Sequence, residues 1–178
     1  MENRVVGFPW SEASVKRSLS SVGGTIGEPR EQFMKYLSYR WDLEPLFAGH
    51  IAGGTHHAFW DRGEGFCVFS DIAVAANVAL RDYPETIRQI MIVDLDVHQG
   101  NGNARLFADK PSVFTFSVHC RENYFSKIEK SDVDVEVGEG AGDDEYLGLL
   151  YKRLPPLVDE VGPDLIFYQV RGMILARP

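Results

Sequence analysis

Short apolar runs that fit buried β-strands alternate along the chain with longer stretches of helical periodicity. The first run, residues 90–95, reads Ile-Met-Ile-Val-Asp-Leu and carries a carboxylate, Asp94, near its end. Residues 113–117 and 165–169 have the same character. Continuous apolar runs of this length are typical of parallel strands that are covered on both faces. Strands that alternate with helices predict an α/β fold with a mostly parallel sheet.

The N-terminal part of the chain is expected to form two helices. The first has Ser11 as its N-cap and ends at Gly23-Gly24, and its apolar face consists of Trp10, Val15, Leu19 and Val22. The second covers residues 29–39, and its inward side chains are expected to be Phe33, Tyr36 and Leu37.

Two further helices are predicted around the apolar runs. Ser70 is the expected N-cap of an alanine-rich helix over residues 71–83. Residues 143–161 are expected to form a helix that is bent or interrupted at Pro155-Pro156. Because ligands of open parallel sheets bind beyond the carboxyl ends of the strands, the segment from Asp94 onwards is a candidate site.

Composition limits the possible functions. The 178 residues suffice for one domain with a hydrophobic core, and the formal net charge of −8 argues against general nucleic-acid binding. No apolar stretch approaches a membrane span. Cys67 lies in an apolar run, which favours buried reduced thiols and an intracellular compartment. Nucleus or cytoplasm is the expected location, and plastid or mitochondrion stays an alternative.

Asp94-Leu95-Asp96-Val97-His98 is the first candidate site. On extended backbone, residues two apart point the same way, so Asp94, Asp96 and His98 can converge. Carboxylate oxygen and imidazole nitrogen are ligands that suit zinc. The alternative is a pair of hydrogen-bonded aspartates with a structural role only.

Two more motifs precede this string. His56 and His57 follow two glycines, and because adjacent side chains diverge, they fit a proton-transfer pair better than a chelate. Two ordinary loop histidines are the alternative. Gly65-Phe66 lies just before a helix cap, where it can form a channel wall or simply a turn with core aromatics.

Together and in this order, the three motifs closely resemble the histone deacetylase family, over roughly residues 53–169. The resemblance implies a three-layer α/β sandwich with a central mostly parallel sheet, the arginase-deacetylase fold, and one partial deacetylase domain over residues 1–178. The string from His98 to Gly102, His-Gln-Gly-Asn-Gly, resembles class IV and the bacterial and plant enzymes more than class I. Class I usually has His-Gly-Asp at the positions of Gln99, Gly100 and Asn101.

The resemblance implies a role for each motif residue in hydrolysis of the amide of acetyl-lysine. Zinc is bound by Asp96 and His98. Asp94 orients His56, the base that takes a proton from water, and His57 protonates the leaving amine with Asn101 as its neighbour. The residues implied for the substrate tunnel are Gly65, Phe66 and Phe125. The residues implied for a structural potassium site are Asp94, Asp96, His98 and Ser117. His119 is expected to be structural, and His50 to lie on a surface or loop.

The chain departs from the family pattern after Gln169. The family continues with Ala-Gly-x-Asp, whose aspartate is the third zinc ligand, whereas residues 170–178 contain no Asp, Glu, His or Cys. We therefore expect a chain truncated at both ends, which lacks the C-terminal part of the fold and the third ligand and is catalytically impaired. Residues 27–48 also diverge.

Several functions stay open at this point. The expected partner is an acetylated protein, a histone tail or another acetyl-lysine substrate, with no nucleic acid and no membrane. The alternatives are a non-catalytic deacetylase-like binding or regulatory variant, and a hydrolase of small acetylated amides. A two-manganese member of the superfamily would need further aspartates beyond Gln169, and residues 170–178 contain none.

Overall fold

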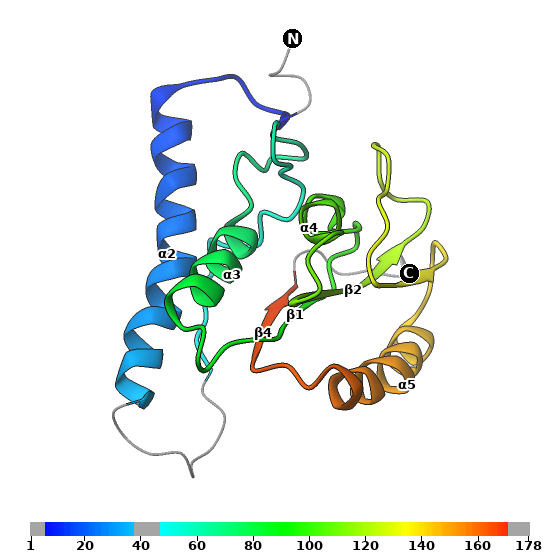
Figure 1. Ribbon diagram of the computed structural model, residues 1–178. Helices are drawn as coiled ribbons and strands as arrows, with labels where there is room; N and C mark the ends of the chain where they lie inside the picture. Colours follow the sequence, from blue (N-terminus) through cyan, green and yellow to red (C-terminus); the bar gives the residue numbers. More distant parts are fainter. Residues whose placement is uncertain (1–5, 38–46, 171–178) are drawn as a thin grey trace. The chain divides into compact units, whose positions relative to one another are not determined.

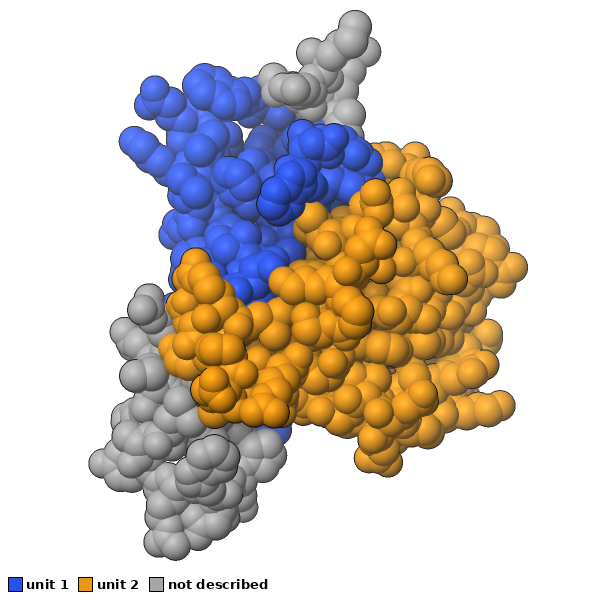
Figure 2. Space-filling model, viewed as in Figure 1, with its two compact units in different colours: residues 1–78 blue, residues 79–178 orange. Residues whose placement is uncertain are grey.

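The structure is a computed structural model that describes residues 6–37 and 47–170, with the backbone alone for residues 28–37. The chain divides into two compact units, residues 1–78 and 79–178, and the boundary falls within helix α3, Asp71–Asp82 (Figure 2). The prediction of one partial domain over the whole chain stays a prediction.

The second unit is built around a four-stranded parallel sheet in the order β3-β2-β1-β4. Its strands are β1 Ile90–Asp94, β2 Val113–Cys120, β3 Val133–Val137 and β4 Leu165–Gln169. The predicted parallel sheet is therefore confirmed, and β1 and β4 match the predicted runs closely. Strand β2 continues three residues beyond the predicted end, and β3 was not predicted.

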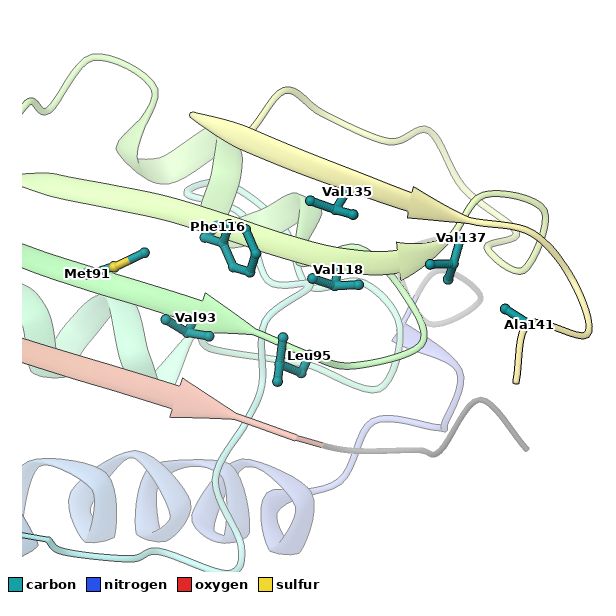
Figure 3. Packing of buried hydrophobic residues seen from close by; sticks show 8 residues of the cluster. All are labelled: Met91, Val93, Leu95, Phe116, Val118, Val135, Val137 and Ala141. Atoms are coloured by element: carbon teal, nitrogen blue, oxygen red, sulfur yellow. The ribbon is translucent and has the colours of Figure 1, made fainter. Parts of the chain in front are cut away.

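Helix α5, Asp143–Val161, connects β3 to β4 across one face of the sheet (Figure 1). The side chains beneath it alternate along the strands and form an apolar cluster, which consists of Met91, Val93, Leu95, Phe116, Val118, Val135, Val137 and Ala141 (Figure 3). Apolar residues of α5, among them Leu150 and Leu154, pack against this cluster. Burial of such a face contributes roughly 25 cal/mol per Å² of apolar surface.

Strand β1 lies between β2 and β4, and all five of its residues are buried. The chain leaves β1 on the side of β2, through the short helix α4, Asn101–Phe107, and later returns through α5 to β4 on the other side. The direction of winding thus reverses at the carboxyl end of β1, the position at which open α/β sheets bind ligands. The segment that follows Asp94 lies there.

Helix α2 of the first unit covers Glu12–Leu37 without a break, so the prediction of two helices separated at Gly23-Gly24 was wrong. Two glycines lower helix stability by about 1 kcal/mol each but do not forbid the helix. The predicted N-cap is confirmed, because Ser14 N donates to Ser11 Oγ at 3.0 Å. The predicted inward side chains Phe33, Tyr36 and Leu37 lie outside the described side chains.

The predicted apolar face of α2 was only partly right. Val22 is buried, but Leu19 and Trp10 are 55% and 67% exposed, and Trp10 precedes the helix. Small polar residues occupy much of the covered side instead. Ser21 Oγ, for example, donates to Ala52 O at 2.6 Å, and Thr25 Oγ1 donates to Asp71 at 2.7 Å.

Helices α3 and α5 begin where the sequence predicts. Ser70 is the N-cap of α3, since Ala73 N donates to Ser70 Oγ at 3.2 Å. The predicted interruption of α5 at Pro155-Pro156 is wrong, because the helix is continuous through both prolines. The carbonyl groups that lose their partners there belong to Tyr151 and Lys152, which are exposed, so water can satisfy them.

The two glycines within α2 give a matched test of this packing. A Cβ at Gly24 would lie 2.3 Å from the His50 ring, whereas a Cβ at Gly23 would meet nothing within 4 Å. Gly24→Ala should lower the free energy of unfolding by about 2 kcal/mol through overpacking. Gly23→Ala should raise it by about 0.5–1 kcal/mol through helix propensity. Urea unfolding followed by circular dichroism measures both, and equal effects would contradict the packing.

Candidate functional site

The string Asp94–His98 begins where β1 ends, and its backbone is paired on both sides. Leu95 N donates to Gln169 O, and Cys120 N donates to Val97 O, both at 2.9 Å. These bonds extend the pairing of β1 with β4 and β2 beyond the last residue of the strand. The string therefore starts from backbone whose position is set by two neighbouring strands.

Beyond Asp94 the string turns instead of staying extended, which corrects the geometry expected from the sequence. Asp96 N donates to Asp94 Oδ1 at 3.1 Å, and His98 N donates to Asp96 Oδ1 at 2.8 Å. Each carboxylate thus satisfies the backbone N–H two residues later, as in Asx-turns. The convergence of Asp96 and His98 is nevertheless present, because Asp96 Oδ1 and His98 Nδ1 are 3.3 Å apart.

This distance fits two ligands of one zinc ion. Ligand atoms of a tetrahedral zinc with bonds of 2.0–2.1 Å are about 3.4 Å apart. Asp96 is 3% exposed, while the side chain of His98 is 38% exposed, so one ligand is buried and the other accessible. Within residues 6–37 and 47–170, no group of three or more His, Cys, Asp or Glu side chains is arranged to hold a metal.

Ser117 of β2 is in register with Asp94 of β1, so the structure brings together two of the residues expected at a potassium site. Ser117 Oγ is 2.9 Å from His119 Nδ1, and both residues are buried. His119 Nε2 has no hydrogen-bond partner among the described residues. The potassium ion itself stays a prediction.

Burial governs the titration of the groups around the string. It lowers the pKa of His119 below its ordinary 6.5, although the carboxylates of Asp134, Glu136 and Asp94 act in the opposite direction. Burial also raises the pKa of Tyr146 on α5, together with Tyr168 and the carboxylates of Asp94 and Asp96, to about 12. The lowered pKa favours the neutral form of His119, whose structural role stays a prediction.

Asn101, at the start of α4, is fully buried. Its Nδ2 donates to Lys127 O at 3.2 Å, and its Oδ1 accepts from Gly102 N at 3.0 Å. The amide thus binds the backbone of its own neighbour and that of the connection between β2 and β3. Its predicted contact with His57 stays a prediction.

In the first unit, His56 and His57 are both buried, and their ring centroids are 3.9 Å apart. The backbone of Gly65 lies against the second ring, because a Cβ at Gly65 would be 2.6 Å from His57 Cδ2. A glycine is required at this position for close approach. The structure thus joins two predicted site elements, the histidine pair and Gly65. His50, expected on a surface or loop, lies in a loop but is half-buried.

Gly65 and Phe66 form the tip of a tight turn. Glu64 N donates to Cys67 O at 3.0 Å and Cys67 N to Glu64 O at 2.8 Å, and both central residues have positive φ, 53° and 65°. This is the pattern of a type I′ turn, which favours glycine or asparagine at both positions. Phe66 is the only described non-glycine residue with positive φ, and its side chain is 63% exposed. Strained backbone that displays an aromatic ring is typical of functional sites.

Phe125, the other expected tunnel residue, is 73% exposed and lies in the connection between β2 and β3. Its ring contacts Tyr124, at 4.7 Å between centroids, and Tyr124 lies 5.5 Å from the His98 ring. An aromatic pair therefore stands beside a predicted metal ligand. The sequence did not assign a role to Tyr124.

Asp71 was predicted only as the first residue of a helix, but it organises the loop before His56. Its carboxylate accepts from Thr25 Oγ1, Gly54 N, Thr55 N and Thr55 Oγ1, at 2.7 to 2.9 Å. Burial is the largest influence and raises the pKa of Asp71, but these hydrogen bonds together outweigh it and leave the pKa below 3.8. In the sequence, the only local sign of this role was a carboxylate directly after the expected N-cap serine.

Comparison with known proteins agrees with these motifs. Residues 5–172 match the histone deacetylase domain. The chain belongs to the histone deacetylase family. It is 45% identical over 165 residues to an uncharacterized protein of Picosynechococcus sp., covering 93% of this chain and 51% of that protein. It is 34% identical to histone deacetylase 2 of Arabidopsis thaliana, covering 86% of this chain and 38% of the relative.

A solved structure supports the fold as well. The crystal structure of a histone deacetylase homolog from Aquifex aeolicus matches 91% of this chain and 44% of its own, with a TM-score of 0.67 and 28% identity. The predicted arginase-deacetylase α/β fold is thereby confirmed. The chain spans about half the length of the Picosynechococcus protein and less of the other two. No described helix is both long and apolar enough to cross a membrane.

The Asp71 carboxylate predicts a specific acid sensitivity. Because its pKa is below 3.8 in the folded chain, its stabilising effect is complete above that value and is lost as the pH falls through the folded pKa. Asp71→Asn places an NH₂ group against hydrogen-bond donors and should lower the free energy of unfolding by about 3 kcal/mol at pH 7.

Denaturant titrations between pH 7 and pH 3 measure this effect. The free energy of unfolding of the wild type should fall more steeply below about pH 4 than that of Asp71→Asn. Asp61, whose side chain is 73% exposed, provides the control, and Asp61→Asn should change stability by less than about 0.5 kcal/mol. Parallel pH profiles for the wild type and Asp71→Asn would contradict the role of this carboxylate.

Proposed function

We propose that the chain is part of a zinc-dependent lysine deacetylase, which hydrolyses the N-acetyl amide of acetyl-lysine in a histone or another protein. The observation that carries the proposal is the 3.3 Å distance between Asp96 Oδ1 and His98 Nδ1 at the carboxyl end of β1, in a member of the histone deacetylase family. This spacing is compatible with zinc ligation, and the family membership favours it over a purely structural aspartate pair.

Asp96 and His98 are the residues that would hold the metal. A bound zinc ion would polarise the acetyl carbonyl and would lower the pKa of bound water to about 7. Asp96 stays in place through its hydrogen bond from His98 N. Two ligands among the described residues are fewer than the three of usual catalytic zinc sites, so we expect weak zinc affinity from these residues alone.

The two buried histidines suit the proton transfers. His56 would accept a proton as water attacks the acetyl carbon, and His57 would donate a proton to the lysine nitrogen as the C–N bond breaks, which yields acetate and the free amine. Their burial supports the roles, because proton transfer is most effective away from bulk water. Asp94 and Asn101 are the proposed partners of His56 and His57, respectively.

Gly65, Phe66 and Phe125 are the proposed walls of the acetyl-lysine channel. Gly65 contacts the His57 ring, and the exposed Phe66 ring extends from the same turn. Apolar walls suit the uncharged acetyl-lysine stem. The proposed partner is an acetylated protein, for which the net charge of −8 is favourable when the segment is basic.

Both cysteines are buried thiols outside any disulfide, which supports a reducing intracellular compartment, the nucleus or the cytoplasm.

Substitution of one proposed ligand tests the metal site. Asp96→Ala should abolish zinc binding and any hydrolysis of an acetyl-lysine peptide, because the remaining imidazole binds zinc alone. Zinc content after equilibrium dialysis against zinc-containing buffer and release of acetate measure the two properties. Asp109→Ala, which removes an exposed carboxylate from the same unit, should leave both unchanged.

The outcomes separate the alternatives. Equal zinc content in the wild type and Asp96→Ala would contradict the metal site. A wild type that binds the acetylated peptide without zinc would indicate a binding or regulatory protein instead. Hydrolysis of a small acetylated amide but not of a peptide would replace the proposed protein substrate.

Phe66 offers a test of the channel that separates stability from binding. Phe66→Gly should relieve the strain of a positive φ, worth about 1 kcal/mol, and so keep or raise the free energy of unfolding. It should weaken acetyl-lysine peptide binding about tenfold by removing an apolar wall. Phe66→Tyr keeps the ring and should keep the affinity, as measured by fluorescence anisotropy. Unchanged affinity in Phe66→Gly would remove Phe66 from the channel.

A further inference from the structure

Residues 121–132 connect β2 to β3 and carry the Tyr124–Phe125 pair (Figure 1). We call this segment the β2–β3 loop. It contains no helix or strand, so side chains from elsewhere must satisfy much of its backbone. Two of these side chains come from the segment just after His98. Asn101 donates to Lys127 O, and Gln99 forms a more extensive set of bonds.

Gln99 is 1% exposed, and both ends of its amide are used. Nε2 donates to Glu129 O at 2.6 Å and to Asp134 Oδ1 at 2.8 Å, while Oε1 accepts from Glu129 N at 2.8 Å. Only an amide can supply two donors and an acceptor in this arrangement. Gln99 thus binds the loop backbone as a neighbouring β-strand would.

The far end of the loop is tied to the sheet independently. Ser131 N donates to Asp134 Oδ2 at 3.0 Å, and Thr115 N donates to Asp132 Oδ2 at 2.7 Å. Asp134 therefore accepts from Gln99 with one oxygen and from the loop backbone with the other. Gln99 connects the segment after His98 to this anchored end.

The other part of the loop faces His98. Tyr124 lies 5.5 Å from the His98 ring, and the neighbouring Phe125 is largely exposed. Gln99 holds the end of the loop. A displacement of the loop would therefore move the Tyr124–Phe125 pair relative to the His98 imidazole. Gln99 and His98 are adjacent in sequence, which makes the predicted metal ligand and the loop anchor parts of one segment.

We propose that Gln99 is a positioning residue for substrate binding, whose buried amide fixes the β2–β3 loop and so holds the Tyr124–Phe125 pair beside His98. The identity of the ligand, an acetyl-lysine peptide, rests on the proposed function. The residue acts through the loop and does not contact the reacting atoms.

Gln99→Glu tests the proposal with almost no change in shape. It replaces the Nε2 donor by an oxygen that faces the Asp134 carboxylate, while the acceptor for Glu129 N is kept. Gln89→Glu is the matched control, because the amide of Gln89 makes one exposed hydrogen bond, at 3.3 Å, to Pro111 O. The double variant Gln99→Glu with Asp134→Asn returns a donor to the pair and should rescue it in part.

The measurements follow the loop, the imidazole and the ligand separately. In Gln99→Glu, amide hydrogen exchange over residues 121–132 should be about tenfold faster, since buried hydrogen bonds are lost. The His98 ring resonances should shift as the Tyr124 ring moves away. Affinity for an acetyl-lysine peptide should fall about tenfold. Where the wild type hydrolyses the peptide, KM should rise with little change in kcat.

Unchanged exchange or unchanged affinity in Gln99→Glu would overturn the proposal, and so would an equal effect of Gln89→Glu or no recovery in the double variant. If Gln99→Glu does not fold, Gln99→Met removes the hydrogen bonds without adding charge and should act in the same direction.

Failure of the proposed function has a different signature. A wild-type chain that neither binds nor hydrolyses the peptide contradicts the proposed function and the substrate part of this inference. Hydrogen exchange and the His98 resonances then still decide whether Gln99 fixes the loop.

Discussion

The candidate metal ligands depend on the backbone pairing of β1 at both of its edges. Leu95 and Val97 continue the hydrogen bonding to β4 and β2 after the strand has ended. The chain therefore enters its turn from a fixed position, and the carboxylates of Asp94 and Asp96 direct the turn by binding the next N–H groups. Ligand atoms held in this way need little rearrangement when an ion binds, because folding has already ordered them.

A second constraint acts on the loops, whose backbone has no regular partners. Buried polar side chains supply hydrogen-bond partners to these loops, among them Asp71 for the segment before His56 and Gln99 for the β2–β3 loop. A buried carboxylate or amide is stable only when its hydrogen bonds are made, so these contacts favour one loop conformation over alternatives that leave the group unpaired. In each unit, hydrogen bonds from buried polar side chains thus position a loop that carries candidate site residues.

Most of the sheet could be predicted from the sequence because its central strands are continuous apolar runs. Strand β3, Val-Asp-Val-Glu-Val, was not predicted because the prediction relied on continuous apolar runs. This strand lies at the sheet edge and alternates apolar and acidic residues. Helix α2 was wrongly predicted as two helices because Gly23-Gly24 was interpreted as a helix end. In the structure Gly24 lies inside the helix, where the missing Cβ leaves room for the His50 ring. The types and order of the site residues were predictable from motifs. The roles of Asp71 and Gln99 were not, because side chain to backbone bonds across 16 to 30 positions leave no periodic pattern.

These constraints divide the candidate site into two physical classes. Asp96 and His56, two of the groups proposed for chemistry, are buried. The aromatic residues proposed to contact substrate, Phe66 and Phe125, are exposed at a turn and a loop. Substitutions in the second class change shape at the surface and leave the buried hydrogen bonds intact. Selectivity in such a site can therefore vary without loss of the metal ligands, provided that the buried anchors of the loops are kept.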